Sequence, residues 1–123
     1  MSMANYIKSA DWKAEKHVPA ITVTPSLPQS STPSLSYEVE VSVGKEIPHP
    51  NTVEHYIAWI ALYYVVEGSQ LPVELARAEF RGHGPDVFTE PVLKTTVRLP
   101  KPGTLHAAAY CNLHGLWESE LKL

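Results

Sequence analysis

The chain has 123 residues, of which 44% are hydrophobic and 19% are charged, and its formal net charge is -3 at pH 7. This length suits one hydrophobic core, so we expect residues 1–123 to form a single domain. The acidic balance excludes the basic surface that nucleic acid or an anionic membrane needs, and one cysteine excludes an internal disulfide and suits a reducing, cytoplasmic setting.

The first half of the chain predicts three strands. A brief β-prone run at 20–24 is followed by a proline- and serine-rich stretch at 25–34, which we expect to be an exposed connection. Residues 35–43 alternate strictly between apolar and polar side chains, which indicates a half-buried strand. Residues 57–66 are apolar on both faces, as in a central strand, although periodicity does not exclude a buried helix. This longest apolar run is about half of a membrane-spanning length, and the first 16 residues do not have the pattern of a signal peptide.

The second half predicts four more strands, at 73–81, 92–99, 104–111 and 116–123, with turns at 82–85 and 100–103. Eleven prolines against six glycines also favour rigid turns over long helices. Seven short strands separated by turns predict an all-β fold, an immunoglobulin-like antiparallel β-sandwich or barrel.

The only cysteine lies near the end of the chain, and a histidine follows it by three residues. Cys111 and His114 could bind one metal ion from a tight turn, and Gly115 would let the backbone turn away after the second ligand. Alone, this pair indicates little, because a free cysteine is usually a buried core residue.

Three polar segments upstream contain further histidines. They are Glu15-Lys16-His17-Val18-Pro19, Gly44-Lys45-Glu46-Ile47-Pro48-His49-Pro50, and the stretch from Asn51 to Ile60, which contains Glu54-His55-Tyr56. Loops on a β scaffold are where sites are usually built. Together with the stretch from Cys111 to Glu118, these segments closely resemble the short, single-iron superoxide reductases, also called neelaredoxins, over nearly the whole chain.

The resemblance implies one iron ion held by four histidine nitrogens in a plane and by a cysteine sulfur on the axis. The matching residues are His17, His49, His55, His114 and Cys111. Glu15 matches a glutamate that can take the sixth position when the iron is ferric, and Lys16 matches a lysine over the open face. The implied reaction is one-electron reduction of superoxide to hydrogen peroxide. The implied partners are rubredoxin or a similar small electron donor, and further copies of the chain in a homotetramer.

The donor set also favours iron on chemical grounds. Structural zinc prefers four ligands in a tetrahedron, so five candidate ligands with an open position suit it poorly. Blue copper uses two histidines, one cysteine and a weak axial methionine, and the only methionines here are Met1 and Met3. A thiolate opposite an open position pushes electron density through the metal toward an oxygen species.

Other residues have simpler interpretations. His83 and His106 lie outside the motifs, and we interpret both as non-ligands. Trp12 and Trp117 are close to motif residues and could shield the site. The sequence leaves open three alternatives: a metal-binding electron-transfer sandwich, a hydrolase with Cys111 as nucleophile, and an interaction module with incidental histidines.

Overall fold

The computed structural model describes residues 1–26 and 35–123. In this part of the chain seven strands form two antiparallel sheets, and a short 3-10 helix, η1, lies at Met3–Asn5. The strands are β1 (Pro19–Pro25), β2 (Ser36–Val43), β3 (Ile57–Val66), β4 (Val73–Glu79), β5 (Val92–Arg98), β6 (Gly103–Cys111) and β7 (Gly115–Lys122). None of the helices described is long and apolar enough to cross a membrane.

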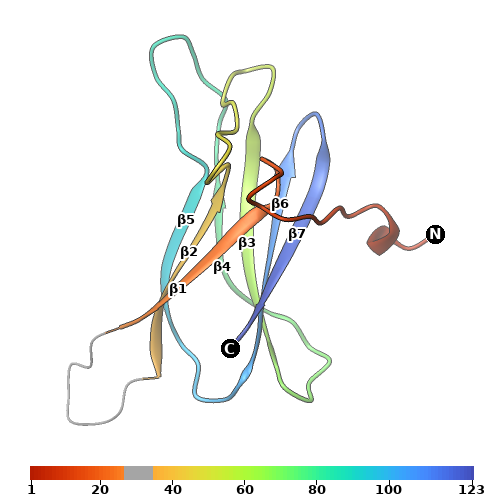
Figure 1. Cartoon of the computed structure of the whole chain (residues 1–123), viewed down its shortest axis with the longest axis vertical. Coiled ribbons are helices and arrows are strands. Elements are labelled where there is room, and N and C mark those ends of the chain that lie inside the picture. The colour runs from red at the N-terminus through yellow and green to blue at the C-terminus, as the bar shows by residue number, and fades with distance from the viewer. Residues whose placement is uncertain (27–34) are drawn as a thin grey trace.

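The two sheets face each other as a sandwich (Figure 1). One sheet has the order β1-β2-β5 and the other has the order β4-β3-β6-β7. All of these pairings are antiparallel. The predicted immunoglobulin-like all-β fold is therefore confirmed.

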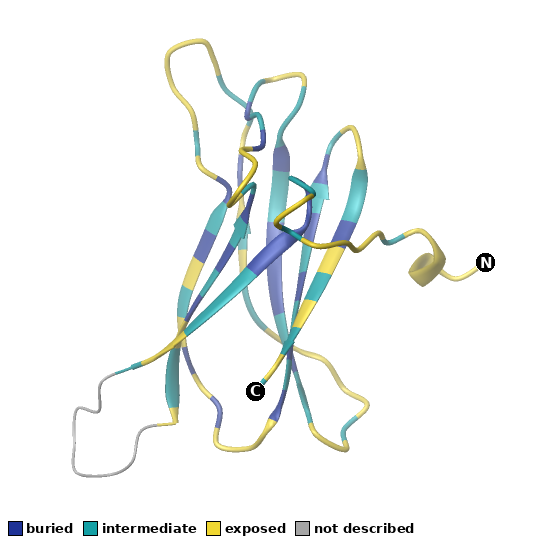
Figure 2. Ribbon diagram, in the orientation of Figure 1, coloured by how far each residue is buried: buried dark blue, intermediate teal, exposed yellow. Residues whose placement is uncertain are grey.

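The core lies between the sheets and is made by alternate residues of the inner strands (Figure 2). In β6 every second residue from Gly103 to Cys111 is buried, because successive side chains of a strand point to opposite faces. Cys111 is the last inward residue of β6 and is fully buried. The only cysteine therefore stands at one end of the hydrophobic core.

A β-bulge breaks the pairing of β3 with β6 close to that end. Ile57 is opposite Cys111, but the next pair is Trp59 with Tyr110. Residues three positions apart in a regular strand point to opposite faces. Because of the extra residue, Ile57 and Ile60 are both buried in the core. Bulges of this kind reorient the neighbouring chain next to functional sites, and here the bulge lies just after the predicted ligand His55.

The strand bounds differ from the prediction only at their ends. The strand predicted at 73–81 ends at Glu79, and Leu35 lies just outside β2 and is 41% exposed rather than buried. The run 57–66, for which a buried helix was an alternative, is strand β3. Most of the loop predicted at 25–34 lies outside the described residues, although Pro25 is the last residue of β1.

Candidate metal centre

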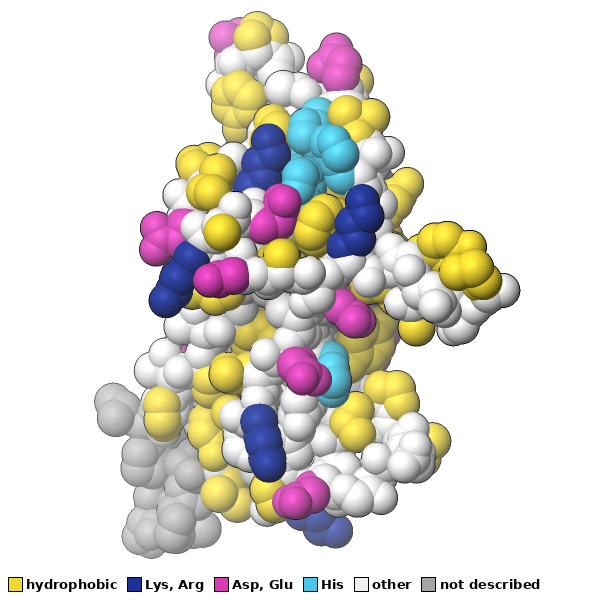
Figure 3. Space-filling model, turned by 45° about the vertical axis from the view of Figure 1, so that its right-hand side comes forward, with side chains coloured by type: hydrophobic (Ala, Val, Ile, Leu, Met, Phe, Trp, Pro, Cys, Tyr) yellow, Lys and Arg dark blue, Asp and Glu magenta, His cyan; other side chains and the backbone are white. Residues whose placement is uncertain are grey.

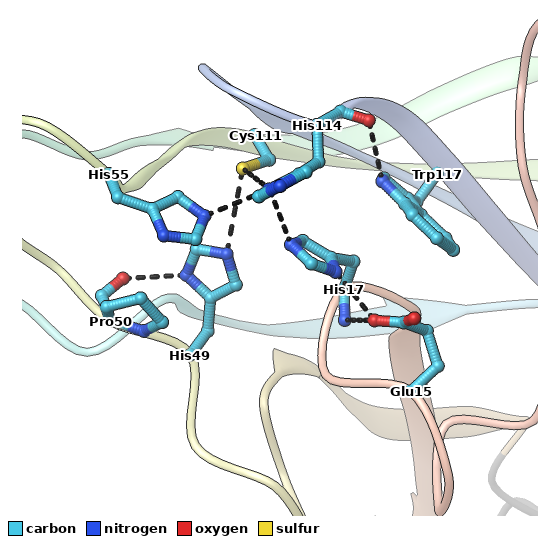
Figure 4. A network of polar contacts seen from close by, with 8 residues as sticks. All are labelled: Glu15, His17, His49, Pro50, His55, Cys111, His114 and Trp117. Carbon is cyan, nitrogen blue, oxygen red and sulfur yellow. Dashed lines mark hydrogen bonds and ion pairs between the residues drawn. The ribbon is translucent and has the colours of Figure 1, made fainter.

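The predicted ligands meet at the end of the sandwich where Cys111 closes the core. His17 lies two residues before the start of β1, His49 and His55 lie in the connection from β2 to β3, and His114 lies in the turn between β6 and β7. His17 and His114 are 97 positions apart in the sequence, yet His17 Nε2 lies 3.1 Å from His114 Nδ1. The sandwich topology therefore brings together all four predicted histidines and the cysteine (Figure 4).

The four imidazoles form a closed ring. Neighbouring ring centroids are 4.5–4.9 Å apart in the cyclic order His17, His49, His55, His114. The centroids of His17 and His55, which are opposite in this order, are 6.0 Å apart. Neighbouring planes are inclined by 61–76°. Four imidazole edges thus surround a common centre.

The nitrogen atoms at this centre are spaced as ligands of one ion would be. His114 Nδ1 lies 3.2 Å from His55 Nε2 and, as noted, 3.1 Å from His17 Nε2. Two nitrogens about 2.1 Å from an ion and at right angles to each other are roughly 3.0 Å apart. The donor atoms of His17, His49, His55 and Cys111 all lie within 4.8 Å of one another. One metal ion could therefore contact all of these groups.

The cysteine sulfur lies against this ring rather than within it. Cys111 Sγ is 3.6 Å from His49 Nε2 and 3.6 Å from His114 Nδ1, two nitrogens of opposite imidazoles. A donor equally distant from two opposite members of a ring lies in the plane that bisects them, and this plane contains the axis of the ring. These distances are therefore compatible with a sulfur on the axis, and an ion that takes six ligands would then keep one position open.

Hydrogen bonds fix which nitrogen two of the imidazoles present to the centre. His17 Nδ1 is 2.6 Å from Glu15 Oε1, and His49 Nδ1 is 2.6 Å from the carbonyl oxygen of Pro50. Each acceptor keeps a proton on Nδ1 and leaves the Nε2 lone pair free for a metal. Such partners both orient a ligand and increase its basicity.

Three of the histidines are also held in the neutral form that can bind a metal. Burial lowers the pKa of His17, His49 and His55, and for His49 it lowers the pKa to about 4. The positive charge of Lys16 adds to the lowering at all three histidines. Near neutral pH these imidazoles therefore offer lone pairs rather than protons.

Glu15 and Lys16 lie beside the ring in different roles. Glu15 Oε1 accepts hydrogen bonds from both the backbone N–H and Nδ1 of His17. Burial raises the pKa of Glu15, but the bonds from His17 outweigh this and keep the pKa below its usual value. The positive charge of Lys16 contributes to the lowered pKa of His17, His49 and His55. Basic side chains flank histidine side chains on this face of the molecular surface (Figure 3).

Two residues were missed, or only partly anticipated, by the sequence analysis. Trp117, expected only to shield the site, stacks on His17 and donates a hydrogen bond from Nε1 to the carbonyl of His114, 3.1 Å away. Asn112 was assigned no role, yet its side chain bonds the backbone on both sides of His55. In the sequence, the position of Asn112 directly after Cys111 was the one feature that could have indicated a role at the site.

Three other residues singled out in the sequence have contacts outside the ring. His106 faces Glu120, with Nδ1 3.7 Å from Oε2, on the outer face of the β6–β7 pair. The backbone N–H of His83 donates to the carbonyl of Asn51 in the β2–β3 connection. Trp12 contacts the ammonium groups of Lys13 and Lys45.

The chain is similar in sequence and in fold to known proteins. Residues 9–120 match the family model described as desulfoferrodoxin. The superoxide reductase of Pyrococcus horikoshii is 50% identical over 117 residues, which cover 95% of each chain. The neelaredoxin of Megalodesulfovibrio gigas is 40% identical over 97% of this chain and 95% of its own. The reduced superoxide reductase (neelaredoxin) of Archaeoglobus fulgidus superposes with a TM-score of 0.83 at 47% identity, covering 96% of this chain and 98% of that one.

Proposed function

Because this chain belongs to the desulfoferrodoxin family and is a superoxide reductase, an oxidoreductase that acts on superoxide, we propose that it works with one iron ion at the histidine ring. The proposed ligands are His17, His49, His55, His114 and Cys111. Bound iron would supply one electron to superoxide, which takes up two protons and leaves as hydrogen peroxide. We propose that residues 1–123 form a single iron-binding superoxide reductase domain.

The observation that carries this proposal is the closed ring of four imidazoles with the Cys111 thiol 3.6 Å from the nitrogens of two opposite members. These residues offer five donors, whereas structural zinc prefers four ligands in a tetrahedron. Nitrogen and sulfur donors in this number suit a redox-active transition metal. The family membership sets aside the hydrolase and the interaction module that the sequence left open.

The chain's own groups prepare the site before any substrate arrives. Glu15 and the Pro50 carbonyl orient two ligand imidazoles, and Trp117 holds the plane of His17. Complete burial of Cys111 excludes water from the sulfur. These constraints keep the donors in place, so that little rearrangement accompanies the loss or gain of an electron.

We propose that Lys16 attracts superoxide to the open side. The whole chain carries a charge of -3, which repels an anion, so attraction must be local. Glu15 would take a second role after the iron is oxidised and occupy the open position. In the structure its Oε1 is bound to His17, so this role requires Glu15 to leave His17 or to use its other oxygen.

Two partners complete the proposal. The chain has a single cysteine and no second group of metal ligands among the described residues, so electrons must come from outside, from rubredoxin or a similar small carrier. Stopped-flow mixing with reduced rubredoxin tests this, and absence of electron transfer on the turnover timescale would exclude that donor.

We also propose that the chain assembles as a homotetramer. Light scattering measures the mass in solution, and a value equal to the monomer mass of 13.6 kDa would contradict this proposal.

The central test combines metal analysis with product counting. We expect one iron per chain and one hydrogen peroxide per superoxide consumed, whereas a dismutase would form one per two. His49→Ala should lose the iron, and His106→Ala, a histidine outside the ring, should retain it. A protein that consumes superoxide without iron, or a His49→Ala variant with full iron content, would contradict the proposal.

A further inference from the structure

The side chain of Asn112 joins two segments of the candidate metal centre that are distant in sequence. Its Oδ1 accepts a hydrogen bond from the backbone N–H of Tyr56 at 2.8 Å, and its Nδ2 donates to the carbonyl of Glu54 at 2.9 Å. Its own backbone N–H donates to the carbonyl of Tyr56 at 3.2 Å. Three hydrogen bonds therefore hold the residues on both sides of His55 against the turn that follows Cys111.

These bonds continue the sheet beyond its last regular pair. The β3–β6 pairing ends at Ile57 with Cys111, so Tyr56 and Asn112 would form the next pair of the antiparallel ladder. One backbone bond of that pair is present, from Asn112 to Tyr56. The return bond from the Tyr56 N–H goes to the Asn112 side chain instead of its backbone carbonyl. The side-chain amide thus replaces a peptide group.

Because the side chain makes this bond, the main chain can leave the sheet at Asn112 instead of continuing the ladder through its backbone carbonyl. Residues 112–114 form a turn directly after β6, and the turn brings His114 Nδ1 back to 3.6 Å from Cys111 Sγ. A main chain that continued straight in the ladder would carry His114 away from Cys111, since each strand residue advances by roughly 3.3 Å. An amide is suited to this position because it has both a donor and an acceptor.

The segment that Asn112 holds is itself a compact unit. Thr52 and His55 exchange backbone hydrogen bonds of 2.9 and 3.3 Å, and Thr52 Oγ1 accepts a further bond from the His55 N–H at 3.1 Å. None of these bonds ties the unit to β6. The donors of His55 and His114 lie 3.2 Å apart, and apart from this contact between donors, the bonds to Asn112 are the described hydrogen bonds that join the unit to the turn after β6. They therefore help to set the place of His55 relative to Cys111 and His114.

We infer that Asn112 is a positioning residue, whose side chain fixes the His55 segment against the Cys111–His114 turn and so sets the spacing of three of the donors. The inference rests on the proposed function, because it concerns the donors of the iron site. Loss of a residue that orients ligands without binding the metal commonly lowers metal affinity by roughly 10- to 100-fold. Asn112 does not touch the donors, so its effect must act through backbone position.

The test uses Asn112→Ala, Asn112→Asp and the control Ser69→Ala. Ser69 also bonds a backbone N–H, that of Leu71 at 3.0 Å, but lies in the β3–β4 connection at the other end of the sandwich. In metal-free protein, NMR hydrogen exchange of the Tyr56 amide should accelerate at least about tenfold in Asn112→Ala. In Asn112→Asp, which keeps the acceptor for Tyr56, it should change less.

Cobalt(II) titration of the same proteins is the second measurement. We expect affinity to fall roughly 10- to 100-fold in Asn112→Ala, by an intermediate factor in Asn112→Asp, and not at all in Ser69→Ala. Unchanged affinity in Asn112→Ala, or in Asn112→Asp if the alanine variant does not fold, would overturn the inference. An equal loss in Ser69→Ala would also overturn it, because general destabilisation would then be the cause. Failure of the parent protein to bind cobalt(II) or iron(II) would instead count against the proposed function.

Discussion

The indole of Trp117 lies nearly parallel to the imidazole of His17, with ring centroids 5.0 Å apart and an angle of 16° between the planes. Trp117 also donates a hydrogen bond from Nε1 to the His114 carbonyl. One buried side chain therefore contacts two proposed ligands from opposite ends of the sequence. The Lys8 ammonium lies 5.5 Å from the indole centroid, and the backbone of Lys8 forms an isolated parallel bridge with Trp117 in β7.

The first prediction separates the two contacts of Trp117. Trp117→Phe keeps an aromatic ring against His17 but loses the bond to His114, so we expect modest loss of metal affinity. Trp117→Ala loses both contacts and should lower the free energy of unfolding by about 3–5 kcal/mol. Denaturant titration and cobalt(II) binding measure the two effects. Equal affinity in the parent and both variants would show that Trp117 contributes to packing alone.

The second prediction concerns the axial sulfur. Cys111→Ser replaces a thiolate by a hydroxyl, which is a harder and much weaker ligand for a transition metal. We expect the visible sulfur-to-iron charge-transfer band of the oxidised protein to disappear. Absorption spectroscopy after iron loading measures this, with His106→Ala as the control that should keep the band. A band that survives in Cys111→Ser would exclude sulfur as the axial donor.

The third prediction concerns the capture of superoxide. A unit charge pair at 4 Å is worth about 1 kcal/mol in water and about 4 kcal/mol near a protein surface. Lys16 is only half-buried, so we expect the lower part of this range, which corresponds to about tenfold slower capture in Lys16→Ala. The dependence of the rate on ionic strength should also become flatter, because a local attractive charge is removed.

Pulse radiolysis across a salt series measures both quantities. Lys101→Ala is the matched control, because Lys101 is an exposed lysine in the turn before β6, at the other end of the sandwich. Glu15→Ala should leave capture nearly unchanged, since Glu15 is proposed to enter the open position only after oxidation. Equal rates and salt slopes for Lys16→Ala and the parent would show that Lys16 is an ordinary surface lysine.

The fourth prediction concerns Gly44, which precedes the loop of His49. Gly44 has a φ of +84°, and a Cβ there would lie 2.5 Å from the His49 backbone nitrogen. Gly68 has the same φ, but a Cβ there would meet nothing within 4 Å. Gly68→Ala should therefore cost only the left-handed strain, about 1–2 kcal/mol. Gly44→Ala should cost more and should also weaken metal binding by moving His49.

Thermal denaturation of the metal-free proteins and cobalt(II) titration compare the two alanine variants. The expected pattern is loss of stability in both and loss of metal affinity in Gly44→Ala alone. If Gly68→Ala weakened metal binding as much as Gly44→Ala, the contact with His49 would not be the cause.

The sequence by itself determined the strands, and its resemblance to a known family supplied the set of candidate ligands. Alternation of apolar and polar residues at 35–43 located β2 to within one residue, since the period of a strand is visible in the chain order alone. The spacing of Cys111 and His114 predicted a tight turn between them, and the turn lies at residues 112–114. Gly115, where the backbone was expected to turn away, has a left-handed φ of +81°. Local geometry depends on neighbours in sequence, and these features are local.

Only the tertiary structure decided how the donors are arranged and what holds them. The order of the ring, with His17 opposite His55, depends on the pairing of sheets and on the bulge between β3 and β6. The stacking of Trp117 on His17 and the bonds from Asn112 to the His55 segment join residues 56 to 100 positions apart. Such contacts depend on how distant strands pair and pack, and no local spacing in this sequence specifies that.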